Sequence, residues 1–241
     1  MDKFIIEGGN RLCGAVQTQS AKNSVLVLLA ASILTEEQVT IENVPHISDV
    51  LHMSEILQKL GADVCFADGN VTISSGNAAE RDLSSHLTRE LRSSVFMLGS
   101  VLTRFKHARI SYPGGCDIGL RPIDLHLFGL KKLGVKTEER DGYIVCNAEK
   151  LVGANIHLDF PSVGATENII LASVKAQGET VITNAAKEPE IRDLQDFLNQ
   201  MGAGVRGAGT DTIVVRGVQR LHGTRFTPIR DRIEAGTFLI A

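Results

Sequence analysis

The stretch Leu60-Gly61-Ala62-Asp63-Val64-Cys65-Phe66-Ala67-Asp68-Gly69-Asn70-Val71-Thr72-Ile73 contains a glycine stop and then two short alternating segments around an Asp-Gly turn. A similar pattern returns at Leu133-Gly134-Val135 and at Met201-Gly202-Ala203, and the glycines lie 73 and 68 residues apart. A glycine in this place is typical of the left-handed residue that ends a helix. The alternating segments after it predict a hairpin. The chain is therefore built from repeats.

Each of these glycines closes an amphipathic helix, and each such helix follows a strand and a more apolar helix. The amphipathic helices are predicted at Asp49 to Leu60, Asp124 to Leu133 and Ile191 to Met201. The strands are predicted at Val39 to Ile41, Ala108 to Ile110 and Thr180 to Ile182, and the apolar helices at Ala21 to Leu34, Thr88 to Leu102 and Val163 to Ala176. One unit is thus helix, strand, helix, strand, strand. A lone unit could not bury both helices, so we expect three units to pack around one core.

The two ends of the chain depart from the repeat. Phe4-Ile5-Ile6 followed by Gly8-Gly9 predicts a strand and a turn, and Asp231 to Ala241 resembles the opening helix of a fourth unit. The alternative for that last segment is an ordinary C-terminal helix that closes the fold. Because it stops on Phe-Leu-Ile-Ala without a cap or polar tail, we expect that the chain is truncated.

Composition is that of an ordinary globular protein, with 43% hydrophobic and 22% charged residues and a net charge of -3. This mixed charge offers no basic stripe for a nucleic acid. The apolar stretch Val25 to Leu34 is too short to span a membrane, and acidic residues upstream argue against a signal peptide. The four cysteines form no CxxC pair and the seven histidines are scattered. We therefore expect a cytoplasmic protein with no metal and no cofactor.

The most distinctive segment is the loop from Ser111 to Pro122, in which three glycines and two prolines surround Cys116. Arg121 lies a few residues beyond the thiol. A thiol on a glycine platform beside a cation can have a lowered pKa and act as acid, base or nucleophile. The alternative is a buried cysteine that packs as a small hydrophobe, and the residue types alone favour that alternative.

Two helix starts also carry small polar residues. In Ser20-Ala21-Lys22-Asn23-Ser24 we expect Ser20 or Asn23 to cap the helix and Lys22 to place a positive charge beside free N–H groups. Ser162-Val163-Gly164-Ala165-Thr166 occupies the same position in the third unit, and Arg92 lies near the corresponding start in the second. Each feature alone is explained by capping or by a solvated arginine. Together they predict a site for an anionic, phosphorylated substrate.

These segments resemble those of the UDP-N-acetylglucosamine 1-carboxyvinyltransferases, a family of enolpyruvyl transferases. The matching segments run in order through the chain: Ser20 to Asn23, Leu91 to Ser94, Pro113 to His126, Ser162 to Thr166, Glu188 to Ile191 and Asp231 to Glu234. The Pro-Gly-Gly-Cys loop with its downstream Arg-Pro-x-Asp-Leu-His is highly specific among these enzymes. The resemblance therefore favours a functional thiol at Cys116 over a buried structural cysteine.

The resemblance implies an α/β fold called an inside-out α/β barrel, made of two similar domains of three repeated units each. The chain crosses between the domains twice. On this interpretation residues 22–229 form one complete three-unit domain, and residues 1–21 and 230–241 are remnants of the second. The family's aspartate base and further arginines would then lie in the missing half.

The resemblance also implies a reaction and its residues. The enolpyruvyl group of phosphoenolpyruvate moves to the 3'-hydroxyl of UDP-N-acetylglucosamine with release of phosphate, the first committed step of peptidoglycan biosynthesis. Cys116 matches the family's acid, which is also the target of the antibiotic fosfomycin. The matches to substrate-binding residues are Lys22, Arg92 and Arg121 as cations, Asn23 as a sugar contact, Arg121, Pro122, Ile123, Asp124 and Leu125 as the uridine loop, and Ser162, Val163 and Gly164 at the diphosphate.

One departure from the family is visible. Some members carry a lysine just before the Ser-Val-Gly turn, where this chain has Phe160-Pro161. We therefore expect one fewer cation at the diphosphate.

Two other functions stay open. One is 5-enolpyruvylshikimate-3-phosphate synthase, which shares fold and chemistry but lacks this cysteine loop, and the other is a non-catalytic domain that binds a nucleotide sugar. The expected partners are phosphoenolpyruvate and UDP-N-acetylglucosamine, without nucleic acid or membrane. The apolar Phe238, Leu239 and Ile240 of the last helix are expected to fold back onto the domain or to pair with a second copy.

Overall fold

The computed structural model describes residues 3–9, 11–81, 92–111 and 122–241, and the predicted repeat is confirmed in it. The first unit contains α1 (Lys22–Ser32), β1 (Val39–Ile41), α2 (Ser48–Lys59), β2 (Asp63–Ala67) and β3 (Asn70–Ser74). The second contains the short 3-10 helix η1 (Arg92–Val95), α4 (Phe96–Phe105), β4 (His107–Ser111), α5 (Asp124–Lys132), β5 (Lys136–Arg140) and β6 (Tyr143–Asn147). The third contains α6 (Val163–Ser173), β8 (Glu179–Thr183), α7 (Pro189–Gln200), β9 (Gly204–Arg206) and β10 (Thr212–Arg216).

Each unit contributes one sheet. The strand orders are β11-β1-β3-β2, β4-β6-β5 and β7-β8-β10-β9. Two strands were not predicted from the sequence: β7 (Asn155–His157), which pairs in parallel with β8, and β11 (Thr224–Phe226), which pairs in parallel with β1. Each has three residues, and, unlike the equally short Val39-Thr40-Ile41 of β1, neither is made mainly of the β-branched residues that favour a strand.

The turns and helix ends follow the residue types. Gly61, Gly134 and Gly202 have φ angles of 94°, 93° and 95°, so the predicted left-handed helix ends are confirmed. At the hairpin tips, Asp68-Gly69 and Asp141-Gly142 have positive φ at both residues, the geometry that a two-residue hairpin turn requires.

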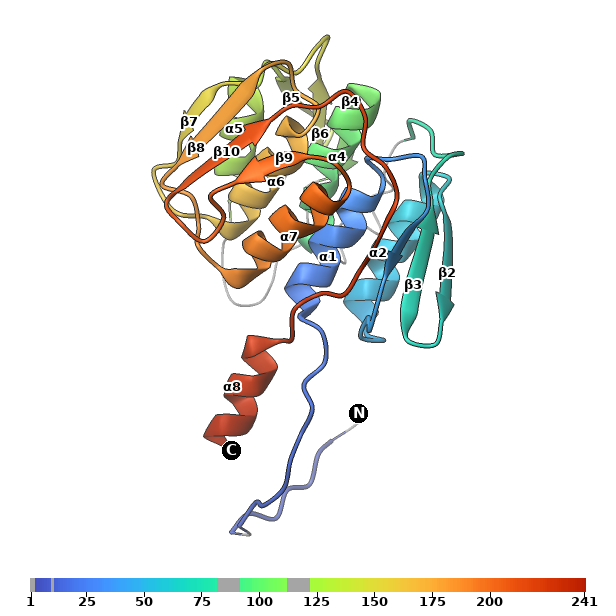
Figure 1. The fold of residues 1–241 in the computed structure, drawn as a ribbon, viewed down its shortest axis with the longest axis vertical. Coiled ribbons are helices and arrows are strands. Elements are labelled where there is room, and N and C mark those ends of the chain that lie inside the picture. The colour runs from blue at the N-terminus through green and yellow to red at the C-terminus, as the bar shows by residue number, and fades with distance from the viewer. Residues whose placement is uncertain (1–2, 10, 82–91, 112–121) are drawn as a thin grey trace.

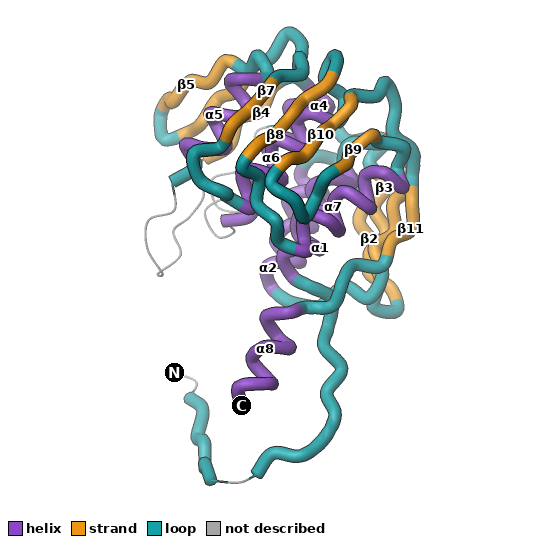
Figure 2. Tube along the Cα trace, turned by 60° about the vertical axis from the view of Figure 1, so that its left-hand side comes forward, coloured by secondary structure: helices purple, strands orange, loops and turns teal. Residues whose placement is uncertain are grey.

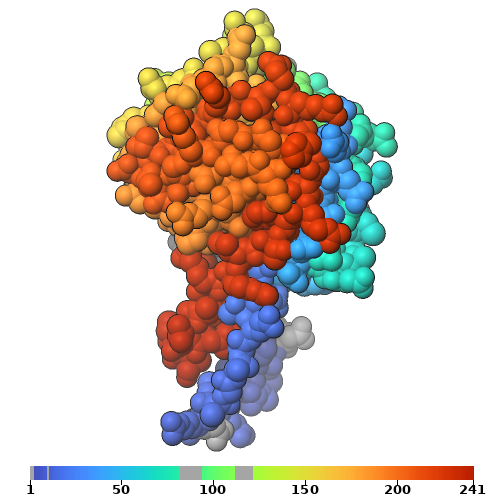
Figure 3. Space-filling view, in the orientation of Figure 1, coloured from blue at the N-terminus to red at the C-terminus, as the bar shows by residue number. Residues whose placement is uncertain are grey.

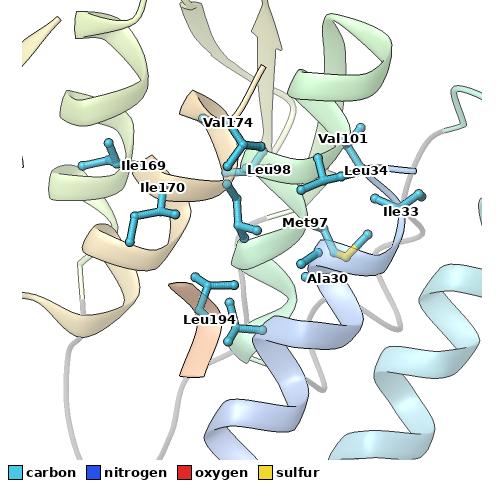
Figure 4. Packing of buried hydrophobic residues seen from close by; sticks show 14 of the residues in the cluster. Ala30, Ile33, Leu34, Met97, Leu98, Val101, Ile169, Ile170, Val174 and Leu194 are labelled. Atoms are coloured by element: carbon cyan, nitrogen blue, oxygen red, sulfur yellow. The ribbon is translucent and has the colours of Figure 1, made fainter. Parts of the chain in front are cut away.

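The first helix of each unit lies in the centre of the fold, and the sheets lie outside (Figures 1 and 2). α1 is buried from Ser24 to Ser32, and α6 is buried from Ala165 to Ser173. A helix that is apolar on all sides must be covered on all sides, which is why these helices form the core. Figure 4 shows Met97 and Leu98 of α4 between α1 and α6.

The central helices run in the same direction, because their C-terminal ends meet. Lys175, just after α6, donates from Nζ to the Leu34 carbonyl beyond α1 at 2.8 Å. Arg104 of α4 donates to the Ile33 carbonyl at 2.7 Å, and Thr103 donates to the Leu171 carbonyl of α6 at 3.0 Å. The N-termini of α1, α4 and α6 therefore share the opposite end of the core.

Two segments of the chain leave the body side by side at that end. Ala21 N–H donates to the Ile229 carbonyl at 2.8 Å, and Asp231 N–H donates to the Gln19 carbonyl at 2.9 Å. Beyond this pairing, residues 3–9, residues 11–19 and α8 (Arg232–Ile240) project from the body (Figures 1 and 3).

The predicted strand at Phe4 to Ile6 is wrong, because residues 3–9 and 11–19 form neither helix nor strand. Cys13, further along this segment, likewise lies in no strand. A strand needs a partner for its backbone groups, and the described chain supplies none at this place.

α8 is helical as predicted, but it does not fold back onto the body. None of its residues is buried, and Leu239 and Ile240 are 88% and 89% exposed. Asp231 explains the direction of the helix. Its backbone is paired with Gln19, and its carboxylate caps α8 by accepting from the N–H groups of Ile233 and Glu234.

Candidate functional site

Lys22 is the first residue of α1 and directly follows Ala21, which pairs with Ile229. Its Nζ donates to Asp49 Oδ2 of α2 at 2.8 Å, and the two side chains are 43% and 34% exposed. An ion pair this exposed adds no more than about 1 kcal/mol to stability. The pair therefore holds the amine in place at the start of α1 more than it stabilises the fold. The sequence does not indicate that Asp49 pairs with Lys22. It shows only that Asp49 lies in the first turn of α2.

The start of α1 is capped by a residue near the end of the chain, Asp231. The prediction that Ser20 or Asn23 caps this helix is wrong: the N-cap residue is Ala21, without a side-chain hydrogen bond. Instead, Lys22 N–H donates to Asp231 Oδ2 at 3.2 Å. Asn23 is exposed beside it. Asp231 thus caps two helices from one position, which only the folded chain reveals.

A second cluster joins the starts of α5 and α6. Ser162 Oγ accepts from Ala165 N–H at 3.3 Å, so Ser162 caps α6, as the alternative explanation of this turn required. His126, in the first turn of α5, packs against Gly164, where an added Cβ would lie 3.0 Å from His126 Cε1. Val163 and Gly164 are half-buried. The residues ahead of α5 and the Ser-Val-Gly turn therefore lie side by side.

The residues at the start of α5 and just ahead of it differ in how exposed their side chains are. Pro122 and Asp124 are exposed and Leu125 is half-buried, so their side chains can meet a ligand. Ile123 is only 5% exposed and belongs to the hydrophobic core. Its side chain therefore anchors the segment in the core.

Three predicted site residues have no described side chain. Cys116 and Arg121 lie outside the described residues. Arg92 begins η1, directly ahead of the central helix α4, and only its backbone is described.

A buried carboxylate of α7 connects the start of α1 to the segment that contains Ile229. Asp193 Oδ2 accepts a short hydrogen bond from Ser24 Oγ and a second one from Ile229 N–H at 3.2 Å. Burial raises the pKa of Asp193, and the hydrogen bond from Ser24 opposes that shift. The carboxylate fixes the first turn of α1, two residues after Lys22.

Two more buried carboxyl groups lie close by. Glu190, one turn before Asp193, accepts from Arg232 Nε at 3.1 Å. Glu167 of α6 is 1% exposed, and its Oε1 has no hydrogen-bond partner among the described residues. Burial raises the pKa of Glu167 well above its ordinary value, and the nearby charges of Glu190 and Glu188 raise it further. Sequence analysis missed Glu167 and Asp193, whose only signal was an acidic residue at a buried helix position.

The arrangement is suited to binding anions. Three helix N-termini, the positive ends of the helix dipoles, lie at one end of the core, and Lys22, paired with Asp49, contributes a cation there. Among the described residues, no group of three or more His, Cys, Asp or Glu side chains is placed to hold a metal ion. Within the same residues, no helix has both the length and the apolar character to cross a membrane.

The sequence matches the family model of EPSP synthase (3-phosphoshikimate 1-carboxyvinyltransferase) over residues 6–241. The chain belongs to this family. Among solved structures, the family fold is seen in the enolpyruvyl transferase NikO from Streptomyces tendae, with a TM-score of 0.86 and 28% identity over 97% of this chain and 56% of that one. An EPSP synthase from Acinetobacter baumannii, at 21% identity, shares the fold with a TM-score of 0.74 over 94% of this chain and 52% of that chain. The expected enolpyruvyl transferase fold is confirmed.

Curated relatives within the family carry a more specific name. UDP-N-acetylglucosamine 1-carboxyvinyltransferase 2 of Caldanaerobacter subterraneus subsp. tengcongensis is 55% identical over 241 residues, which is all of this chain and 58% of that protein. UDP-N-acetylglucosamine 1-carboxyvinyltransferase 1 of Clostridium acetobutylicum is 52% identical over 243 aligned residues, again all of this chain and 58% of that protein. The chain thus spans 58% of the length of these relatives.

Proposed function

We propose that the whole protein transfers the enolpyruvyl group of phosphoenolpyruvate to the 3'-hydroxyl of UDP-N-acetylglucosamine and releases phosphate, the first committed step of peptidoglycan biosynthesis. The observation that carries this proposal is the identity of 49% to 55% with relatives of that name along the entire chain. Both substrates are anions, and the described site gathers helix N-termini and a lysine at one end of the core. We place the reaction in the cytoplasm, in accord with the free thiols of Cys13, Cys65 and Cys146.

The nucleotide sugar is assigned to the cluster at α5 and α6. The N–H groups at the start of α6, with Ser162, Val163 and Gly164, would bind the diphosphate, because a helix N-terminus favours negative charge. Pro122, Asp124 and Leu125 would contact the uridine, with Ile123 contributing its backbone. Phe160 and Pro161 precede the turn and offer it no cation.

Phosphoenolpyruvate is assigned to the cations. Lys22, held by Asp49, would bind phosphate or carboxylate oxygens, and Arg92 and Arg121 would supply further charge. Asn23, exposed next to Lys22, would contact the sugar and the tetrahedral intermediate. Cys116 would protonate the methylene carbon as the addition begins.

The domain division is proposed in the same terms. Residues 22–229 would form one domain, and residues 1–21 and 230–241 would belong to a second, with the crossing at Ser20 and Arg230 between them. The exposed apolar residues of α8 support this division, since such a surface calls for a partner. In the chain alone, a second copy of α8 is the proposed partner.

The family model takes its description from the enzyme that acts on 3-phosphoshikimate, and this makes that activity the second candidate. Phosphate release would be measured for the whole protein with phosphoenolpyruvate and either UDP-N-acetylglucosamine or shikimate 3-phosphate. We expect phosphate release when UDP-N-acetylglucosamine is the acceptor and none when shikimate 3-phosphate is the acceptor. Turnover with shikimate 3-phosphate alone would refute the proposal, and binding of the nucleotide sugar without turnover would favour a non-catalytic role.

Lys22→Ala tests the site within that assay. Loss of one cation aimed at developing charge is expected to lower kcat/KM by about a hundredfold. Stability should hardly change, because the ion pair with Asp49 is exposed. Arg220→Ala is the matched control, since it removes a cation from another exposed pair, with Glu37, and should leave the kinetics unchanged. Unfolding of Lys22→Ala with normal activity in the folded fraction would contradict the assignment.

A further inference from the structure

A group of lysines lines a cavity at the C-terminal ends of the central helices, the end of the core opposite to the proposed substrate site. The cavity has a volume of about 280 Å³ and lies between the segments that follow α4, β6, α6 and β10. Three of its lining residues are Lys106, Lys150 and Lys175, and among the described residues that line it none is acidic. The cavity therefore joins the second unit to the third through positively charged side chains.

The three ammonium groups have N–H donors to spare. Lys106 Nζ donates to the Thr103 carbonyl at 2.9 Å. Lys175 Nζ donates to the Leu34 carbonyl at 2.8 Å. Because an ammonium group carries three N–H donors, each of these lysines keeps two for another partner. Lys150 is exposed on the loop after β6, and its side chain has no hydrogen bond or ion pair with any other residue that the structure describes.

The cations around the cavity repel one another. Burial lowers the pKa of Lys175, the nearby charges of Arg104 and Lys106 lower it further, and the charge of Glu36 opposes that shift. Burial also lowers the pKa of Lys106. The charged form of a half-buried lysine is disfavoured beside other cations and favoured beside an anion. An anion in the cavity would therefore offset a repulsion that the described residues leave in place.

Capping of helix ends explains only two of the three lysines. A cation near a helix C-terminus is favourable, because the last carbonyl groups of the helix have no partner within it. Lys106 fills this role at α4, and Lys175 fills it beyond α1. Lys150 belongs to no helix, and no carbonyl of the described chain accepts from it. Its position beside the other two lysines is what a ligand would explain.

The remaining lining residues suit a small ligand. Gly178 has a φ angle of 91°, and a Cβ added there would meet no atom within 4 Å, so the backbone at this point faces open space. The exposed Gln177 lines the same cavity and carries a neutral amide donor. The cavity volume is just below the roughly 300 Å³ at which pockets for drug-sized ligands begin. It is therefore large enough for a phosphate or diphosphate group, but not for a whole nucleotide.

We propose that this cavity binds a small anion of the phosphate class, held by the ammonium groups of Lys106, Lys150 and Lys175. The site is separate from the one assigned to the substrates, because it lies at the other end of the central helices. Three ammonium groups can bind the oxygens of two phosphoryl groups at once. Pyrophosphate should therefore bind more tightly than inorganic phosphate.

Calorimetric titration of the 241-residue chain with sodium pyrophosphate, at constant ionic strength, tests the proposal. Lys150→Gln should weaken binding about tenfold, the effect of one lost hydrogen bond to a charged group. Its folding should be unchanged, because the side chain of Lys150 contacts no described partner. Lys59→Gln is the matched control: Lys59 is an exposed lysine at the end of α2, and its loss should leave the affinity unchanged. A parallel titration with inorganic phosphate compares the two anions.

Backbone 1H–15N spectra locate the bound anion. We expect pyrophosphate to shift the amide signals of Gly178 and Gly217, which both line the cavity, and the same shifts to need about tenfold more pyrophosphate in Lys150→Gln. Shifts confined to the start of α1 would place the anion at the other end of the core and overturn the proposal. Equal affinity of the wild type and Lys150→Gln, equal weakening in the two lysine variants, or no binding of either anion would overturn it as well.

Discussion

The buried carboxyl group of Glu167 makes the stability of the protein depend on pH. Its pKa is raised well above 4.5, first by burial and then by Glu190 and Glu188. Between 4.5 and the raised pKa, the unfolded chain releases the proton while the folded chain keeps it. The free energy of unfolding therefore falls as pH rises through this range. Glu167→Gln stays neutral throughout. Relative to this variant, the wild-type free energy of unfolding should fall by up to about 1.4 kcal/mol per pH unit above about pH 5, measured by urea unfolding. Parallel pH profiles would contradict this.

The cysteines differ in how readily each thiol ionises. Burial raises the pKa of Cys146 to about 12, whereas Cys13 and Cys65 are exposed. Because the thiolate is the reactive form, limiting iodoacetamide should label Cys13 and Cys65 well before Cys146. The proposed acid, Cys116, should be labelled first of all. Peptide mapping gives the order, with labelling in urea as the control. Equal labelling of all four in the native protein would contradict it.

At the scale of elements, the helix-ending glycines are not equivalent. A Cβ on Gly61 would lie 2.9 Å from the Asn77 carbonyl oxygen, whereas on Gly134 the nearest atom is 3.5 Å away. Both positions have positive φ, which costs alanine about 1 kcal/mol. Gly61→Ala should therefore lose more stability than Gly134→Ala in urea unfolding. Gly236→Ala, in open space within α8, is the control and should not destabilise. Equal losses at Gly61 and Gly134 would contradict the steric argument.

The repeat made most elements readable from the sequence. The predicted bounds of α2, α5 and α7 lie within two residues of those observed, because each helix has one apolar face and a glycine at its end. β7 and β11 were missed because their three residues include few of the β-branched types that indicated the equally short β1. The cap of α1 was missed because Asp231 reaches it only through the crossing of two distant segments.

At the scale of the molecule, the sequence could predict charged and polar residues for a site but not their partners. Lys22 and Ser162 were predicted because helix starts have a recognisable composition. Asp49 and Asp193 were not, because they meet their partners only through packing between units. The roles of Cys116 and Arg121 stay predictions, since both lie outside the described residues.

The 241-residue chain by itself should fold but should not catalyse the reaction. α1, α4 and α6 with their sheets form a continuous core, so the 241-residue chain should fold by itself. Yet it spans 58% of its relatives, and α8 leaves Leu239 and Ile240 exposed beside the site's end of the core. Holding two substrates in place can lower the activation barrier by roughly 7 to 11 kcal/mol. A chain that forms only part of the proposed site would lose this contribution. Calorimetry should show weak binding of UDP-N-acetylglucosamine, and the phosphate assay should show no turnover. Enzymatic rates of phosphate release from this chain would mean that three units build a whole active site.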